Sequence, residues 1–246
     1  MISRYASLRQ GLVGAWCPSL GASGFRLIDR SGYNNHGVLI GMDPGTDWVA
    51  SGGKLALDFD GVNDYVDLGT STKIGQAGDK TLSVWAFLKE LNRFQAIVSC
   101  WSSDLESFEL FVDISSSRLG GGFYSTGFVV AAAASTNIWQ HWIVKQSGNV
   151  YELYRNGVLI SSATHSTRTG TTTATAFLGQ RAGSYFFNGQ LDDVRIYNRA
   201  LTPSEIKLLY TGGRGVGLMP ERIKHRRKTT AAATNRRRRI LIGASS

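Results

Sequence analysis

Short runs in which apolar and polar residues alternate recur along the chain, and each run ends at turn-forming residues such as Gly, Asn, Asp or Ser. Alternation with a period of two is typical of half-buried β-strands. Asn156-Gly157 and Asn188-Gly189 are pairs that favour tight turns between antiparallel strands. Because helical patterns do not alternate with these runs, the sequence predicts an all-β sandwich of two antiparallel sheets. The expected strands cover residues 11–16, 37–41, 81–89, 95–101, 107–114, 121–125, 137–146, 150–162, 174–180 and 190–198.

An aspartate-rich stretch, LALDFDGVNDYVDLG at residues 55–69, has the pattern of two strands joined by a tight turn. Asp60-Gly61 suits that turn because glycine accepts positive φ angles. An EF-hand calcium loop that began at Asp58 would need Gly at its sixth position and a carboxylate at its twelfth. These positions hold Asn63 and Gly69. We therefore expect a hairpin whose aspartates face solvent.

One helix is predicted after the last strand, in TPSEIKLLYTGG. Thr202 and Glu205 match a capping box, and Gly212 is placed to end the helix. Ile206 and Leu209 give the helix an apolar face. We expect this short helix to dock on a sheet.

The net charge of +9 is confined to the C-terminal part of the chain. Residues 213–246 hold ten Lys or Arg and one Glu, which gives 10 − 1 = +9. Residues 1–212 hold 27 − 10 = 17 bases and 18 − 1 = 17 acids. We therefore divide the chain into a neutral body, residues 1–212, and a basic extension, residues 213–246.

Neither a membrane-spanning apolar run nor an export signal is expected from the sequence. Cys17 and Cys100 are too few for a disulfide scaffold, and no Cys-His spacing suggests zinc. We expect two buried thiols, with a single disulfide as the alternative.

Several motifs resemble, in order, those of a laminin-G-like domain of the concanavalin A-like lectin/glucanase superfamily. They are GLVGAW, LIDRSGYNNHGVLIG, ALDFDGVNDYVDLG, TLSVWAFLK, WQHWIVKQSGNVYELYRNGVLI and FNGQLDDVRIYNRALTPSEIKLLY, and they cover about residues 10 to 212. The resemblance implies a two-sheet antiparallel jelly roll that serves as a binding or adhesion module for carbohydrate or protein ligands. It also implies that the DFDGVNDYV hairpin is structural.

The resemblance further implies one structural calcium ion, held between an early loop and a late strand. The matching positions are Asp29 and Asn34 in the loop, and Asp192 or its neighbour Asp193 in the strand. Carboxylate and amide oxygens suit a hard cation. The alternative is an Asx-rich turn satisfied by its own backbone.

Catalysis is not expected, although some members of the superfamily hydrolyse glycosides. A retaining hydrolase needs two carboxylates close together on one face. Glu106, Glu109 and Asp113 come nearest to this, but their spacings of three and four place them on both faces of a strand. We interpret them as surface charges. His141, between two tryptophans, is interpreted as a packed strand residue.

Sugar sites combine aromatic platforms with planar polar groups. The candidate ligand-binding residues are Trp101, Tyr124, Arg181 and Tyr185.

The basic extension has three interpretations: an unstructured arm in solvent, a nucleic-acid-binding arm, or an assembly arm. No aromatic residue lies among its arginines to stack on bases, which disfavours nucleic acid. Four arginines followed by Ile-Leu-Ile combine electrostatic steering with an apolar anchor, which favours docking on an acidic neighbouring subunit by strand addition. The contacts are expected from Arg226, Arg227, Lys228, Arg236, Arg237, Arg238, Arg239, Ile240 and Ile242.

A module of the family that the chain resembles meets its ligands outside the cell, yet no export signal is recognised here. A phage particle reconciles the two, because its proteins assemble in the cytoplasm and leave by lysis. We therefore expect a non-catalytic virion component, such as a capsid decoration, head fibre or tail protein, present in many copies on the particle surface. The alternative is a secreted or cell-surface carbohydrate-binding adhesion protein, and a glycoside hydrolase is less favoured.

Overall fold

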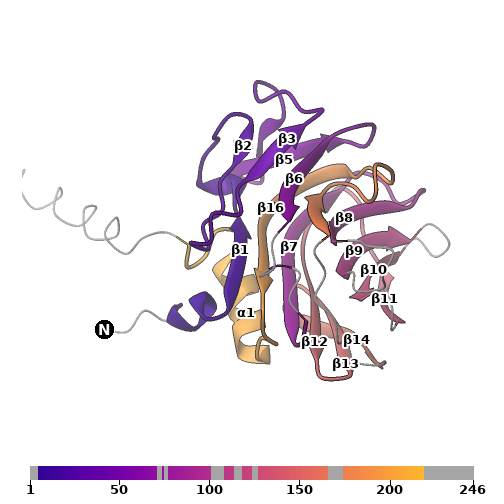
Figure 1. The fold of residues 1–246 in the computed structure, drawn as a ribbon. Coiled ribbons are helices and arrows are strands. Elements are labelled where there is room, and N and C mark those ends of the chain that lie inside the picture. The colour runs from indigo at the N-terminus through magenta and orange to yellow at the C-terminus, as the bar shows by residue number, and fades with distance from the viewer. Residues whose placement is uncertain are drawn as a thin grey trace, which may run out of the picture.

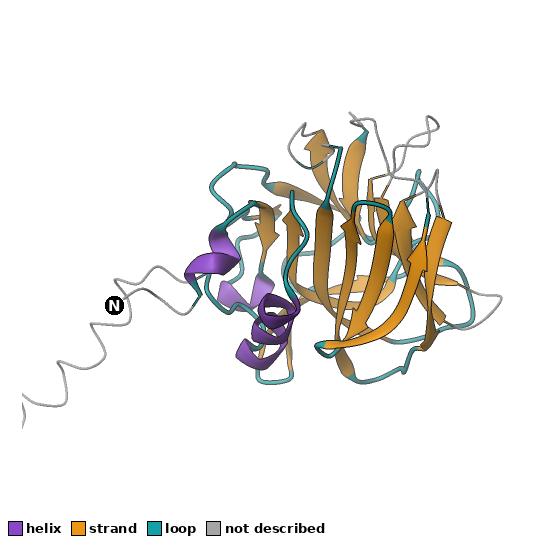
Figure 2. Cartoon of the chain, turned by 90° about the horizontal axis from the view of Figure 1, so that it is seen from below, coloured by secondary structure: helices purple, strands orange, loops and turns teal. Residues whose placement is uncertain are grey.

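The computed structural model describes residues 5–70, 74, 77–100, 108–113, 118–123, 127–165 and 174–218. They form two antiparallel β-sheets packed face to face, with helical segments on one outer face (Figures 1 and 2). The predicted all-β sandwich with one short C-terminal helix is confirmed.

Sheet A is built around β7 (Lys80–Leu88) and β16 (Asn188–Tyr197), which are buried along most of both faces, and this explains why Val84 to Leu88 are apolar at consecutive positions. Its strand order is β14 (Val158–Thr164), β13 (Val150–Arg155), β12 (Trp139–Ser147), β7 (Lys80–Leu88), β16 (Asn188–Tyr197), β5 (Lys54–Asp60) and β4 (Trp48–Ser51), with β1 (Leu12–Trp16) paired to β16.

In sheet B, the edge-side strand β3 shows the alternation of a sheet with one solvated face, since Gly37 and Leu39 are buried while Val38 and Ile40 are exposed, whereas β8 is buried at every position. The strand order of sheet B is β11 (Gly127–Ala133), β10 (Arg118–Phe123), β9 (Phe108–Asp113), β8 (Gln95–Cys100), β15 (Thr175–Leu178), β6 (Tyr65–Thr70), β3 (Gly37–Ile40) and β2 (Arg26–Leu27).

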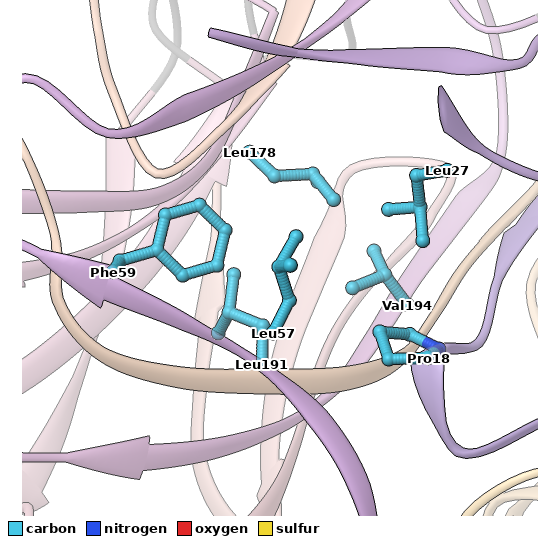
Figure 3. Close-up of a pocket in the computed structure, with 7 residues that line it drawn as sticks. All are labelled: Pro18, Leu27, Leu57, Phe59, Leu178, Leu191 and Val194. Atoms are coloured by element: carbon cyan, nitrogen blue, oxygen red, sulfur yellow. The ribbon is translucent and has the colours of Figure 1, made fainter. Parts of the chain in front are cut away.

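The main core fills the space between the sheets. Phe59 of β5 and Phe187 pack edge to face with ring centroids 5.8 Å apart, and both side chains are fully buried. Figure 3 shows a small gap in this core, which is too narrow for a water molecule and is lined by apolar side chains alone. Its lining residues are Pro18, Leu27, Leu57, Phe59, Leu178, Leu191 and Val194. We interpret it as a packing gap and not as a ligand site.

A second apolar cluster covers the outer face of sheet A. It joins the strands to the 3-10 helix η1 (Ala6–Arg9) and to the helix α1 (Pro203–Gly212), while a further 3-10 turn, η2 (Pro18–Leu20), follows β1. The predicted capping box is present: the Thr202 side chain accepts from the Glu205 N–H, and the Glu205 carboxylate accepts from the Thr202 N–H. The cluster contains Leu8, Leu12, Ala15, Cys17, Ile143, Tyr154, Tyr197, Leu201, Ile206, Leu209, Val216 and Leu218. Both cysteines of the chain are buried free thiols.

Residues 213–218, the first of the basic extension, pack against the body. The Arg214 guanidinium lies over the Trp139 ring at 4.3 Å, donates to the carbonyl of Ser51 and places Nε 3.4 Å from Oδ2 of Asp192. Val216 and Leu218 belong to the second apolar cluster. The packed body therefore continues at least to Leu218. Whether the two parts of the chain fold independently stays a prediction.

The hairpin at residues 55–69 has the predicted turn, with Gly61 at φ 79°, but its aspartates do not all face solvent. Asp64 is 4% exposed and its Oδ2 accepts from the Asp60 N–H at 2.9 Å. Asp58 pairs with Lys89 at 2.9 Å. The alternation distinguishes the two faces of a strand, but it does not show that a turn folds a carboxylate back over its own backbone.

Candidate functional site on the outer face of sheet B

The outer face of sheet B carries aromatic and charged side chains across several strands. Leu110 and Val112 of β9 point into the core, so Glu109 and Phe111 lie on the opposite face. In β15, Phe177 lies on this outer face for the same reason. The outer face of sheet B is therefore formed by the residues that alternate with the core positions.

A loop between β15 and β16 folds over this face. Gly179 has φ 83°, and Ala182 and Tyr185 have φ angles of 52° and 55°, so the backbone turns sharply through the left-handed region. Ser99 Oγ donates to the carbonyl of Gln180 at 2.7 Å. Phe187 returns the chain to the core, where its side chain is fully buried. The loop is therefore anchored at both ends.

Arg181 and Tyr185, both candidates from the sequence, come together on this loop. The Arg181 guanidinium carbon lies 4.8 Å from the Tyr185 ring centroid and 4.9 Å from that of Phe94. Phe94 contacts Tyr185 edge to face at 4.8 Å and stacks on Phe111 at 5.1 Å. Tyr185 is 45% exposed, so one aromatic ring beside a guanidinium faces solvent.

Glu109 lies beneath Arg181, with Arg181 Nη1 3.1 Å from Glu109 Oε2. The Glu109 side chain is 1% exposed, so the interpretation of this residue as a surface charge is wrong. Burial raises the pKa of Glu109 to about 7, against the opposing effect of Arg181. The sequence could not show this burial, because the covering loop lies about 70 residues further along the chain.

The arrangement suits recognition better than hydrolysis. An exposed ring stacks on a sugar face, and a neighbouring guanidinium donates hydrogen bonds. Retaining hydrolysis needs a second carboxylate about 5–5.5 Å from the first. Within the described residues, the Glu109 carboxylate is held in an ion pair with Arg181.

The remaining candidates from the sequence lie elsewhere in the chain. Trp101, Tyr124 and Glu106 lie outside the described residues, as do all the residues expected to make the assembly contacts, from Arg226 to Ile242. Phe94 and Phe111 were not predicted. Phe94 has no distinguishing pattern in its loop, and Phe111 is one outward position among many.

The residues expected to bind calcium make other contacts. Asp29 accepts from the N–H groups of Ala15, Ser31 and Asn35 and from the Ser31 hydroxyl. Asn34 is exposed, with φ 59°. No group of three or more His, Cys, Asp or Glu side chains suited to a metal was found in the described part of the chain. These contacts fit the Asx-turn alternative, and calcium binding stays a prediction.

Asp192, the strand member of the calcium set, is fully buried, and its Oδ1 accepts from the Ser19 N–H at 3.0 Å. Its Oδ2 faces Arg214. A cation at Asp192 would therefore have to compete with a guanidinium.

His141 is 2% exposed, and its Nε2 lies 2.8 Å from the hydroxyl of buried Ser83. Its ring stacks with Trp85 at 5.0 Å and with Tyr210 of α1 at 6.3 Å. Burial lowers the pKa of His141 to about 3. The histidine–serine pair is closed off beneath α1, so it has the role of a packed pair, as its setting between tryptophans predicts.

The family described as concanavalin A-like lectin/glucanases superfamily matches residues 60–207, more than half of the chain. The chain belongs to this superfamily. The resemblance seen in the sequence motifs is therefore confirmed. A comparison with curated proteins found no match.

Several solved structures have a similar fold, and their sequence identity to this chain is low. The binding domain of Paraclostridial Mosquitocidal Protein 1 has a TM-score of 0.64 and 18% identity, over 82% of this chain and 52% of that one. Trypanosoma rangeli sialidase in complex with the inhibitor DANA has a TM-score of 0.62 and 14% identity, over 81% of this chain and 32% of the sialidase. A third similar structure is domain 4 of AbnA, a GH43 extracellular arabinanase from Geobacillus stearothermophilus, in complex with arabinotriose. It has a TM-score of 0.59 and 18% identity, over 80% of this chain and 96% of that domain.

These likenesses establish the fold alone. The chain spans about half the length of the toxin binding domain and about a third of the sialidase. Among the described residues, no helix is both long and apolar enough to span a bilayer.

Proposed function

We propose that this protein is a non-catalytic carbohydrate-binding module whose ligand site is the Arg181–Tyr185 cluster on the outer face of sheet B. The observation that carries the proposal is the exposed Tyr185 ring beside the Arg181 guanidinium, on a loop fixed at both ends. A rigid aromatic platform with an adjacent hydrogen-bond donor is the usual chemistry of sugar recognition.

Two comparisons support a binding role. The AbnA domain, which this chain covers almost completely, was solved with arabinotriose, and the mosquitocidal neighbour is a binding domain. The sialidase neighbour is an enzyme, so fold similarity does not decide between binding and catalysis. Within the described residues, the buried carboxylate of Glu109 is paired with Arg181, which favours binding.

We further propose that the module acts in many copies on a phage particle, exposed at its surface and held there by the basic extension. The charge distribution supports this: residues 219–246, which lie beyond the described residues, hold nine Lys or Arg and one Glu, 9 − 1 = +8. A shallow site binds weakly by itself, and display in many copies supplies avidity. A secreted or cell-surface adhesion protein would use the same site.

A glycan-binding screen tests the ligand site. Wild-type protein is expected to bind glycans on an array that includes arabinan-, glucan- and sialic-acid-containing oligosaccharides. Tyr185→Ala should abolish the signal, while Tyr33→Ala, which removes a tyrosine that is 51% exposed on another loop, should retain it. Equal loss in both variants, or binding that survives Tyr185→Ala, contradicts the proposed site.

Particle association tests the second proposal. The parent particle is expected to contain many copies of the protein, detectable by mass spectrometry of purified virions. Finding the chain only in a secreted or cell-surface fraction would favour the adhesion alternative.

A further inference from the structure

An apolar area lies at the β3 end of the outer face of sheet B, apart from the Arg181–Tyr185 cluster. Val38 and Ile40 of β3 are 49% and 39% exposed. Ile40 pairs with Tyr65 of β6, and the Tyr65 ring packs on Phe177 of β15 with centroids 5.8 Å apart. These β-branched and aromatic side chains are neighbours on this face, and the Tyr65 ring also contacts Phe186 of the β15–β16 loop, with centroids 6.4 Å apart.

Aspartates lie in the two connections that join this end of sheet B to sheet A: Asp43 and Asp47 between β3 and β4, and Asp60 at the turn between β5 and β6. The Asp60 N–H donates to Asp64 Oδ2 at 2.9 Å and the Asp58 N–H donates to the Asp47 carbonyl at 2.8 Å, so these four residues are neighbours. Burial raises the pKa of Asp64 to about 6. Asp47 also accepts from the Asp43 N–H. Residues 43–67 hold six aspartates and one lysine, 1 − 6 = −5.

Most of this negative charge is unpaired. Asp58 pairs with Lys89, but within the described residues no ion pair joins Asp43, Asp47 or Asp60 to a base. The surface formed by Val38, Ile40 and Tyr65, together with Asp43, Asp47 and Asp60, is named the acidic β3 surface below.

We propose that the acidic β3 surface binds residues 236–242 of a second copy of this chain. Arg236 to Arg239 would face the carboxylates, and Ile240 to Ile242 would lie on Val38 and Ile40. The inference rests on the proposed role of the basic extension in assembly and names its receptor. Opposite charge and a matching apolar segment in one stretch of seven residues provide the complementarity.

The position of the last described residue favours a second copy over the same molecule. Leu218 belongs to the apolar cluster on the outer face of sheet A, whereas Val38 and Ile40 lie on the outer face of sheet B. Residues 219–235 extend at most about 60 Å and would have to pass around the edge of the sandwich. A neighbouring molecule avoids this path. Contacts that join different faces repeat head to tail, as in rings or filaments.

A complementation experiment tests the proposal. One variant keeps the extension and loses the surface: Asp43→Asn, Asp47→Asn, Asp60→Asn and Ile40→Ser. The asparagines retain an acceptor for the turn hydrogen bonds at these positions. The other variant keeps the surface and ends after Leu218. Val158→Ser, at a side chain that is 63% exposed on β14, is the control for loss of apolar surface.

Light scattering and sedimentation at low ionic strength give the outcome. Wild type and Val158→Ser should self-associate, each single-defect variant should be monomeric, and the two defective variants mixed should form a heterodimer. Neutralising the three acids accounts for about a tenfold part of this loss of affinity, Ile40→Ser for the rest, and added salt should act in the same direction.

Unchanged self-association of either variant, or a mixture that stays monomeric, overturns the proposal. So does a wild-type monomer whose extension crosslinks to its own β3. Glycan binding by the same variants is measured in parallel and should be unchanged, which separates failure of this inference from failure of the ligand site. Incorporation of the surface variant into particles at full occupancy would show that the extension has another receptor.

Discussion

Arg181 Nη1 lies 3.1 Å from Glu109 Oε2 and joins a loop between the last two strands to the centre of sheet B. The pair holds the guanidinium against Phe94 and Tyr185, so a buried carboxylate fixes the polar half of the proposed sugar site. Positioning of a ligand-contacting group by a buried partner is a common device in binding sites.

Glu109 predicts a pH dependence of stability. Burial raises its pKa from 4.5 to about 7 in the folded state. The folded protein therefore binds the proton more tightly than the unfolded chain, and the free energy of unfolding decreases as the pH rises from 4.5 to 7, by roughly 2–3 kcal/mol for this group.

Glu109→Gln removes this titration. The free energy of unfolding is measured with denaturant at about pH 5 and about pH 8, on either side of the folded-state pKa of Glu109. Its change between these two pH values should be smaller for the variant than for wild type. Asp192, whose pKa burial raises to about 6, contributes a slope of the same sign in both proteins. Identical pH dependence in the two proteins would contradict the burial of Glu109 as an ionisable group.

Arg214 predicts where the chain can be shortened. A protein that ends after Gly212 loses the Arg214 contact with Asp192, which is fully buried, and the apolar contacts of Val216 and Leu218. Leaving a buried charge without its partner costs about 3–5 kcal/mol, which corresponds to a fall of roughly 10 °C in Tm for a domain of this size.

A protein that ends after Leu218 retains all of these contacts and should melt within about 2 °C of the full-length chain. Differential scanning calorimetry of the two truncations checks this. Equal Tm values for both would mean that residues 213–218 add nothing to the body.

The capping box of α1 gives a smaller and local prediction. Thr202→Ala removes the acceptor for the Glu205 N–H and should cost about 1 kcal/mol, or roughly 2–4 °C in Tm. Thr211→Ala, at an exposed threonine whose hydroxyl donates to the Lys207 carbonyl in the same helix, is the control and should change Tm by less. A larger effect at Thr211 would contradict the cap assignment.

The fold could be predicted from the sequence because alternation and turn residues are local signals. The Asn156-Gly157 turn joins β13 and β14 as expected, and Thr202 caps α1. The residues that support the candidate site were harder to predict. Arg181 and Tyr185 could be proposed from their residue types, whereas the burial of Glu109 and the pairing of Asp192 with Arg214 depend on segments distant in sequence.

The aspartates show the same limit. Asp64 and Asp192 are both buried, yet nothing adjacent to them in sequence distinguishes them from the exposed Asp60. A carboxylate can be buried only where the fold brings backbone N–H groups or bases to it. These partners are visible only once the sheets are assembled.

The most direct test of the central claim is a crystal structure of the protein bound to the best glycan from the array, with matched titration calorimetry. The account predicts a sugar ring stacked on Tyr185 with a hydroxyl hydrogen-bonded to Arg181, and binding that is lost in Tyr185→Ala but kept in Tyr33→Ala. A sugar bound elsewhere on the sandwich, with full affinity in Tyr185→Ala, would contradict it.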